Sequence, residues 1–333
     1  MPLRVAVLHN LRRAAARPGD TGEAAPLDAE YDSRETVEAL CAALEASGHS
    51  AAPVEADAAC VDALRRLRPD IAFNVAEGLP GEAREAQAPA VCQLLGIPHT
   101  GSGVLALALC LDKAMAKRVL RHEGLPTPAF GVTPPGAEPD ARGLRFPLFV
   151  KPLREGTSMG ISARSVVADE AELRARVAAV HRAYREPALV EEFLGGREFT
   201  VGVLGNAPPR ALPITEINYG ALPPGHPAVY TYQFKKEWDD PRFYLLPAPV
   251  AEGLRRELEE AALGAFRALG CLDVARVDLR LDAAGMPQIL EVNPLPGLAP
   301  GFSDLAKQAD ADGLGYRGLV AAILDAAAAR AGL

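Results

Sequence analysis

Apolar and polar positions follow two different patterns in the first third of the chain, short apolar runs and helical spacing. Short apolar runs at residues 4–8 and 70–75 are typical of strands. Helical spacing between these runs places apolar residues at Val37, Leu40, Cys41 and Leu44. The pattern Asp32-x-x-Glu35 just before them has the form of a helix capping box, and residues 84–95 indicate another helix. Strands that alternate with helices predict a parallel, doubly wound sheet up to about residue 110.

Beyond residue 110 the predicted elements come in mixed order. Asp112 can cap a helix that ends at Gly124 and Pro126. Further helices are predicted over residues 168–183, 251–269 and 314–329. Strands are predicted over residues 146–152, 160–166 and 188–193, with a hairpin around Gly205-Asn206. The composition changes near Asp112 and a strand starts near Leu189, which makes these positions the best candidates for domain boundaries.

Composition and charge narrow the class of protein. The 333 residues are 49% hydrophobic and 23% charged, enough apolar material for a sizeable core in more than one domain. A net charge of −8 and a pI near 5.4 argue against general binding to nucleic acids or anionic membranes. The five cysteines are scattered without a C-x-x-C pair, so we expect reduced thiols. The first apolar run, at the N-terminus, is too short and is followed too closely by polar residues to be a signal peptide. No apolar run approaches the roughly 18 residues of a membrane span. We therefore expect a cytoplasmic protein.

The segment VDLRLDAAGMPQILEVNPLPG, residues 277–297, has the most informative polar pattern. Strand residues two apart share a face, so Arg276 and Asp278 point one way on the first arm. Glu291 and Asn293 share a face on the second arm for the same reason. With a turn centred on residues 283–284, Asp278 would lie diagonally opposite Glu291 on one common face of the sheet.

These side chains suit a divalent cation. Mg²⁺ prefers hard oxygen ligands and takes one or two carboxylates, with phosphates and water completing its shell. Arg276 could then meet negative charge that builds up during a reaction. A solvated sheet face with an Arg–Asp pair is the simpler explanation of the two acids alone. The Asn-Pro-x-Pro-Gly break directly after them favours a functional site, because such loops often carry function.

A lysine and a glycine-rich turn follow the strand predicted at residues 146–152. Lys151 ends the run FPLFVKP, where a lysine can simply extend into solvent. The next turn, Arg154-Glu155-Gly156-Thr157-Ser158-Met159-Gly160, has glycines flanking two hydroxyl residues, so its backbone N–H groups can turn toward a phosphate. It is not a Walker A loop, because G-x-x-x-x-G-K-[ST] is absent.

Two other motifs carry less information. Residues 101–106 fit G-x-G-x-x-A, but the preceding segment is a poor strand and no acid is well placed about 20 residues later, so we expect a plain turn. Asp112-Lys113 can be a helix cap followed by a surface charge. The six histidines form no ligand pair at metal-binding spacing.

Several of these patterns form an ordered series. The series is Asp112-Lys113, Phe149-Val-Lys-Pro-x-Arg-Glu-Gly-Thr-Ser-Met-Gly160, Val190-Glu-Glu-Phe-Leu-x-Gly-Arg-Glu-Phe-Thr200, Arg276-Val-Asp278 and Glu291-Val-Asn-Pro-x-Pro-Gly297. It resembles the D-alanine–D-alanine ligases of the ATP-grasp superfamily, from about Leu94 to the C-terminus. The resemblance implies an α/β ATP-grasp fold of three domains, with an N-terminal parallel-sheet (Rossmann-like) domain and ATP held between two sheets. We expect these domains over residues 1–111, 112–188 and 189–333.

The resemblance also implies a role for each matching residue. Two Mg²⁺ ions, with Mn²⁺ as the alternative, would be held by Asp278, Glu291 and Asn293. The ATP phosphates would be contacted by Lys113 and Lys151. The adenosine pocket would be lined by Glu191, Glu192, Phe193, Leu194 and Glu198. The catalytic residues would be Thr157 and Ser158, which close over the phosphates, and Arg276, which stabilises an oxyanion.

Ligases of this family activate the carboxylate of one amino acid as an acyl phosphate, which the amine of a second then attacks. A carboxylate is a poor electrophile until it is phosphorylated, and phosphoryl transfer needs mainly positioning and charge neutralisation. The resemblance therefore implies D-alanine–D-alanine ligation, a step of peptidoglycan biosynthesis, with small amino acids as substrates and a homodimer as the assembly. The alternatives are a ligase of the same family with another amino-acid or peptide substrate, and a nucleotide-binding protein without catalysis.

Two departures from the family pattern lie in the N-terminal region. Residues 10–22 lack the motif that supplies a glutamate for the first amine, and Glu30 and Asp32 are candidate substitutes. The family motif His-Gly-x-x-Gly-Glu-Asp-Gly is replaced at residues 74–85, where Glu77, Arg84 or Glu85 could serve, or none of them.

Two further departures concern the loops over the second substrate. Residues 230–238 resemble the mobile loop of the family, with Lys236 where that loop commonly has a tyrosine and Thr157 where the phosphate loop has a serine. After Gly297, Ser303 is one residue away from the serine that binds the second carboxylate, and Phe302 is at the nominal place. Our candidate substrate contacts are Ser303, Gly297 and Lys236.

Overall fold

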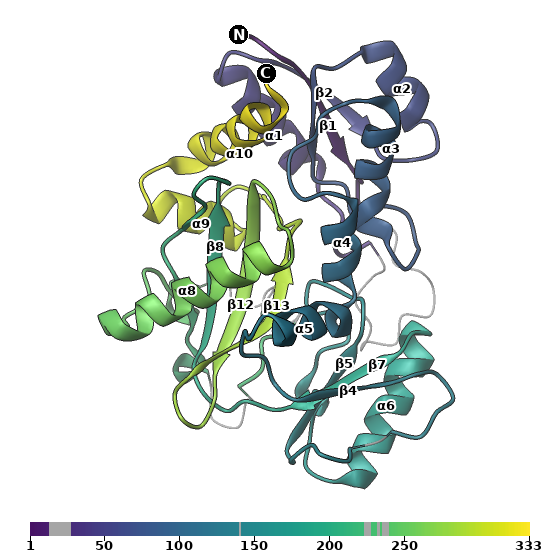
Figure 1. The fold of residues 1–333 in the computed structure, drawn as a ribbon, viewed down its shortest axis with the longest axis vertical. Helices are drawn as coiled ribbons and strands as arrows, with labels where there is room; N and C mark the ends of the chain where they lie inside the picture. The colour runs from purple at the N-terminus through teal and green to yellow at the C-terminus, as the bar shows by residue number, and fades with distance from the viewer. Residues whose placement is uncertain (13–27, 140, 223–227, 232–233, 235–239) are drawn as a thin grey trace.

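Three sheets organise the chain in the computed structural model, which describes residues 1–12, 28–139, 141–222, 228–231, 234 and 240–333 (Figure 1). The N-terminal sheet is parallel, with the order β2-β1-β3. Its strands are β1 (Arg4–His9), β2 (Ser50–Glu55) and β3 (Ile71–Asn74). The helices of this region are α1 (Arg34–Ala46), α2 (Cys60–Leu67), α3 (Gln87–Leu95) after the short turn η1 (Arg84–Ala86), and α4 (Val104–Leu111).

Both faces of the N-terminal sheet are covered, as the alternation of strands and helices predicts. Val5 and Val7 of β1 pack on the side of α1, and Ala6 and Leu8 pack on the side of α2 and α3. The last helix, α10 (Gly315–Ala331), returns to this sheet and packs beside α1, so both termini lie at the same end of the molecule (Figure 1). The parallel doubly wound arrangement predicted from the sequence is confirmed.

Some local expectations in this region are wrong. The α1 helix is capped by Ser33, whose Oγ accepts a hydrogen bond from Thr36 N at 3.2 Å, and not by Asp32. The backbone N–H of Asp32 instead donates to Asn10 O at 3.0 Å, which holds this residue in an extended conformation before the helix. Residues 101–106 are not only a turn, because α4 begins at Val104. Neither β2 nor α2 was predicted: Pro53 and three polar or small positions interrupt the alternation of β2, and α2 is only eight residues long.

The central sheet is antiparallel and has the order β4-β7-β5-β6. Its strands are β4 (Phe130–Thr133), β5 (Leu148–Pro152), β6 (Val166–Val167) and β7 (Ala188–Glu192), and α6 (Glu170–Tyr184) packs on it. The strand predicted at residues 160–166 is wrong, because Ser162 caps the short turn η2 (Ala163–Ser165) and leaves only β6 to pair with β5. The long partner of β5 is β7, so residues 189–192 belong to this sheet.

The C-terminal sheet has the order β11-β10-β8-β12-β13, and β9 pairs with β8. Its strands are β8 (Glu198–Leu204), β9 (Arg210–Ala211), β10 (Thr215–Ile217), β11 (Tyr244–Leu245), β12 (Val274–Leu281) and β13 (Pro287–Asn293). Short turns η3 (Tyr219–Ala221) and η4 (Pro241–Phe243) lie before β11.

Helices from distant parts of the chain cover this sheet. One face packs against α5 (Lys113–His122) and α8 (Glu252–Ala268). The opposite face meets α9 (Asp304–Ala311) at Gly202, where an added Cβ would lie 2.5 Å from Gln308 Oε1. The helices predicted from periodicity beyond residue 110 are confirmed as α5, α6, α8 and α10, with ends shifted by a residue or two. None of the helices in the described ranges combines the length and apolar character needed to cross a bilayer.

Candidate active site

The β12–β13 hairpin brings the predicted metal ligands together. Asp278 lies directly opposite Glu291, and Arg276 lies directly opposite Asn293. The expected diagonal placement of Asp278 and Glu291 is wrong, because Leu290 is an extra residue that shifts the register of β13 by one position. Both acids therefore project side by side from the same face of the sheet.

Asp278 is the centre of a dense hydrogen-bond network. Arg276 donates to it through Nε at 3.0 Å and Nη2 at 2.9 Å, a bidentate pair. Thr200 Oγ1 donates to Asp278 Oδ1 at 2.8 Å, and Asn293 Nδ2 donates to Asp278 Oδ2 at 3.1 Å. These contacts fix the carboxylate in place.

The donor set around this carboxylate fits a hard cation that also takes ligands from a substrate. Two carboxylates face each other, and the amide of Asn293 presents an oxygen when it rotates by half a turn. Among the described residues no group of three or more His, Cys, Asp or Glu side chains is placed to hold a metal. Phosphate and water ligands would thus complete the shell, as is usual for Mg²⁺.

Two predicted lysines approach the same hairpin from other elements. Lys113, at the start of α5, donates to Glu155 O at 2.6 Å and lies 3.7 Å from Glu291 Oε2. Lys151, at the end of β5, lies 2.8 Å from Glu191 Oε1. Burial alone would lower the pKa of Lys151, but the Glu191 and Glu291 carboxylates reverse this effect and raise it. Lys151 therefore keeps its positive charge beside the hairpin.

A cavity of about 80 Å³ lies between the central and C-terminal sheets. Phe149 and Phe193 stack beside it with ring centroids 6.2 Å apart, and Leu290 adds a third apolar side chain. The predicted nucleotide residues that line this cavity are Lys151, Glu191, Glu192, Phe193, Leu194 and Glu198. An apolar cleft with a few buried charges is typical of a small-molecule site.

The acids of this cavity have different environments. Burial raises the pKa of Glu198, whose carboxylate accepts from Tyr219 Oη at 2.7 Å and Arg280 Nη1 at 3.1 Å. The Arg145 guanidinium donates to Glu192 at 3.0 Å and lowers the pKa of that carboxyl. Glu191 is buried with its carboxylate between lysines.

The hydroxyl-rich turn lies over the cavity with unusual backbone angles. Thr157 and Ser158 have φ values of +47° and +57°, a left-handed conformation that bulky residues rarely adopt. Met159 N donates to Gly156 O at 2.8 Å and closes the turn. Ser158 lines the small cavity, and Thr157 lines a larger one farther along the same face of the hairpin.

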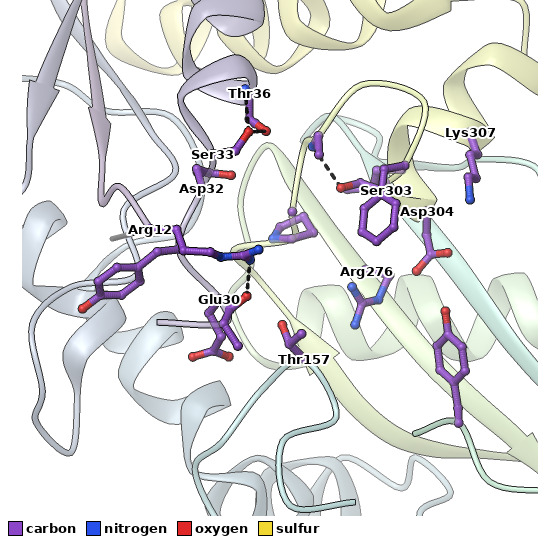
Figure 2. A pocket seen from close by; sticks show the side chains of 18 of the residues that line it. Arg12, Glu30, Asp32, Ser33, Thr36, Thr157, Arg276, Ser303, Asp304 and Lys307 are labelled. Carbon is purple, nitrogen blue, oxygen red and sulfur yellow. Dashed lines mark hydrogen bonds between the residues drawn. The ribbon is translucent and has the colours of Figure 1, made fainter. Parts of the chain in front are cut away.

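That larger cavity, of about 390 Å³, is the substrate-sized space of the site (Figure 2). Gly297 and Ser303 line it together with Arg276 and Thr157. The Ser303 hydroxyl accepts a hydrogen bond from Ala299 N at 2.9 Å, which folds the loop before α9. Both predicted contacts therefore lie at the cavity, and Lys236 lies outside the described residues.

Both acids named as candidate substitutes for the missing N-terminal motif, Glu30 and Asp32, line this cavity. Glu30 lines it beside Thr157 and forms a 2.9 Å ion pair with Arg84, which lies 3.3 Å from Glu155 as well. A narrower space of about 100 Å³, lined by Glu30, Lys113 and Glu291 among others, continues from this cluster to the metal hairpin. Glu30 thus lines both spaces, and Asp32 lines the larger one.

Several charged residues at the site were missed, among them Arg12, Lys307 and Lys117. Arg12 and Lys307 line the large cavity, where they bring positive charge on both sides of Ser303 (Figure 2). Lys117 is buried between α5 and β7, and its four-residue spacing from Lys113 on one helix face was the available signal. No comparable signal marks Arg12, which reaches the site only through the fold of the N-terminal loop.

Comparisons with known proteins agree with this geometry. A family model described as the D-ala D-ala ligase C-terminus matches residues 121–325. The D-alanine–D-alanine ligase of Syntrophotalea carbinolica is 37% identical over 91% of this chain and 94% of that protein. The ligase of Bordetella avium is 42% identical over 70% of each chain, and an uncharacterised protein of Sinorhizobium fredii is 36% identical over 87% of this chain.

A solved structure shows the same fold over nearly the whole chain. The D-alanine–D-alanine ligase of Bacillus anthracis, crystallised with ATP, covers 98% of both chains with a TM-score of 0.74 and 24% identity. The expected ATP-grasp architecture is therefore confirmed. From these matches, together with the ordered motifs and the hairpin geometry, the chain belongs to the D-alanine–D-alanine ligase family and is an ATP-dependent ligase.

Proposed function

We propose that this ligase joins two molecules of D-alanine with ATP and Mg²⁺ through an acyl phosphate. One observation carries the proposal: the small cavity and the large one lie along the same polar face of the β12–β13 hairpin, where Asp278 lines the first and its partner Arg276 lines the second. Glu291 also lines the small cavity. A phosphoryl group bound in the small cavity can thus meet a carboxylate bound in the large one, which is the positioning that phosphoryl transfer requires.

ATP occupies the small cavity in this proposal. The apolar walls at Phe193 and Leu194 take the base, and Glu191, Glu192 and Glu198 surround the adenosine. Lys113 and Lys151 neutralise the phosphates, and the Thr157–Ser158 turn closes over them with its backbone N–H groups. Bound Mg²⁺, or Mn²⁺, on Asp278, Glu291 and Asn293 supplies charge neutralisation for the transferring phosphoryl group.

The two amino acids occupy the large cavity. Glu30 accepts the ammonium group of the first one, because it is the acid that lies beside both Thr157 and Gly156. The carboxylate of the second meets the loop of Gly297 and Ser303 at the start of α9, where backbone N–H groups favour an anion. Arg276 stabilises the oxyanion as the amine attacks, and Lys236 contacts substrate.

A different amino-acid or peptide substrate is the second candidate. It is favoured by the cavity volume of about 390 Å³ and by the positive charges of Arg12 and Lys307. The methyl side chain of alanine offers no group that could pair with these charges. Phe302, 52% exposed, also lines this space at the place where the family has a serine. A larger or anionic second substrate would suit these side chains.

The test is a substrate screen on the purified protein. ATP, Mg²⁺ and D-alanine should release ADP and phosphate and yield the dipeptide, and L-alanine should not. A stronger response to another amino acid would select the second candidate. Absence of amino-acid-dependent ADP release across the screen would refute both.

We also propose the three-domain division suggested by the sequence. The pairing of β7 with β5 supports placing the second boundary after Glu192 instead of at residue 189. Limited proteolysis tests it, since cuts should concentrate near residues 112 and 193.

The expected homodimer stays a prediction, for which sedimentation velocity is the direct measurement.

A further inference from the structure

Lys117 is a buried lysine directly behind the small cavity. It lies on α5 one turn after Lys113, and its side chain is only 2% exposed. Lysine is rarely buried unless its ammonium group is paired, because desolvation of the charge is costly. Lys117 therefore needs partners whose interactions offset this desolvation.

Three groups surround its ammonium nitrogen. Glu191 Oε2 lies 2.9 Å away, and Thr127 Oγ1 accepts a hydrogen bond at 2.7 Å. Ile289 O lies 3.5 Å away and also accepts from the Thr127 hydroxyl at 2.7 Å. Lys117 thus connects β7 with β13 just before the extra residue that places Glu291 opposite Asp278.

Glu191 is shared with a second lysine. Its other oxygen, Oε1, lies 2.8 Å from Lys151 Nζ, so one buried carboxylate meets two ammonium groups. Burial would raise the pKa of Glu191, but the two lysines outweigh this effect and lower it. Lys151 lines the small cavity, whereas Lys117 lies behind its wall. Only Lys151 is placed to reach a bound ligand.

We propose that Lys117 is a positioning residue that keeps Glu191 ionised and in place when Lys151 turns from Glu191 to the phosphates of ATP. The inference rests on the proposed binding of ATP in the small cavity. Without Lys117, release of Lys151 would leave Glu191 as an uncompensated buried charge, which is strongly unfavourable. Lys151 would then remain held by Glu191 and contribute less to nucleotide binding.

The test compares ATP binding by calorimetry in the wild type and in Lys117→Met, with amino-acid KM values as a second readout. We expect Lys117→Met to weaken ATP binding by at least about tenfold, with amino-acid KM values within about twofold of the wild type. Thr127→Val is the matched control, because it removes the hydroxyl that binds both Lys117 and Ile289 but leaves the Lys117–Glu191 ion pair. Its ATP affinity should stay within about twofold of the wild type.

A double variant separates this role from simple packing. Glu191→Gln alone leaves two buried lysines without their acid, whereas Lys117→Met with Glu191→Gln leaves only Lys151. We expect the double variant to bind ATP more tightly than Glu191→Gln alone. Additive losses, or unchanged ATP binding in Lys117→Met, would overturn the inference. If Lys117→Met does not fold, Lys117→Gln replaces it in the same comparison. A wild type that does not bind ATP would instead refute the proposed function, and this inference with it.

Discussion

Asp278 lies directly opposite Glu291 across the β12–β13 hairpin because Leu290 adds one residue to β13 at that point. Leu290 and Glu291 are consecutive, yet both line the small cavity. In a regular strand they would point to opposite faces of the sheet. The bulge therefore places an apolar contact for the nucleotide next to a carboxylate for the metal, a common use of bulges at sites.

Glu291→Gln should abolish ligation while the fold persists. The substitution keeps the size of the side chain and removes the charge that, with Asp278, attracts Mg²⁺. We expect the rate of amino-acid-dependent ADP release to fall by at least about a hundredfold. Loss of a residue that only supports a metal ligand can already lower activity by about that factor. Glu260→Gln on the exposed side of α8 is the matched control and should keep wild-type turnover. Near-normal turnover of Glu291→Gln in saturating Mg²⁺ would refute the metal assignment.

The sequence predicted this hairpin but not its register. Alternation places Asp278 and Glu291 on one face whether the pairing is diagonal or direct, so the pattern contains no sign of the bulge at Leu290. Long periodic elements such as α8 and α10 were predictable because many positions contribute to one signal. The two-residue strand β6 and the short helix α2 offered too few positions.

Site residues divide in the same way. Lys151 and Glu191 each lie in a dense local motif on a strand. The fold brings Lys151 Nζ within 2.8 Å of Glu191 Oε1. Glu30 and Arg12 reach the large cavity from an irregular loop, whose path depends on backbone contacts such as that of Arg12 N with Asp32 O. No periodic pattern encodes such a path, so Glu30 was one of two candidates, with Asp32, and Arg12 was missed.

Glu30→Gln should raise the KM of an amino-acid substrate by about tenfold or more. Glu30 is the acid beside Thr157, and an amide attracts an ammonium group far less than a carboxylate does. ATP affinity should not change, because Glu30 does not line the small cavity. Glu82→Gln, at an exposed position, serves as the control. Equal KM values in the two variants would exclude Glu30 from amine binding.

The stability of the protein should depend on pH through Asp32. Burial raises the pKa of this carboxyl to about 7, so the folded state binds its proton more tightly than the unfolded chain does. The stability contributed by Asp32 therefore falls as the pH rises from about 4 through about 7. Asp32→Asn removes this half-buried charge and should raise Tm by a few degrees at pH 8, with a smaller gain at pH 5. Asp325→Asn, at an exposed position of α10, should show no such pH dependence.

Asp273 should be a stabilising residue without a catalytic role. It is fully buried and accepts hydrogen bonds from Gly101 N at 2.8 Å, Asn206 Nδ2 at 2.7 Å and Arg330 Nη2 at 2.9 Å. Asp273→Asn leaves the Arg330 charge unpaired and should lower the free energy of unfolding by about 2–3 kcal/mol, since Arg330 is partly exposed. Urea unfolding measures this loss. The KM for ATP should stay at the wild-type value, and a large increase would mean that this network shapes the site.

Transfer of an oxygen atom from substrate to phosphate tests the central claim most directly. An acyl phosphate forms when a carboxylate oxygen of the first amino acid attacks the γ-phosphorus of ATP, and that oxygen leaves with the phosphate when the amine attacks. D-alanine labelled with oxygen-18 in its carboxylate should therefore yield dipeptide together with inorganic phosphate that carries one labelled oxygen, and unlabelled ADP. Dipeptide formation with unlabelled phosphate, or with label in AMP, would contradict the account.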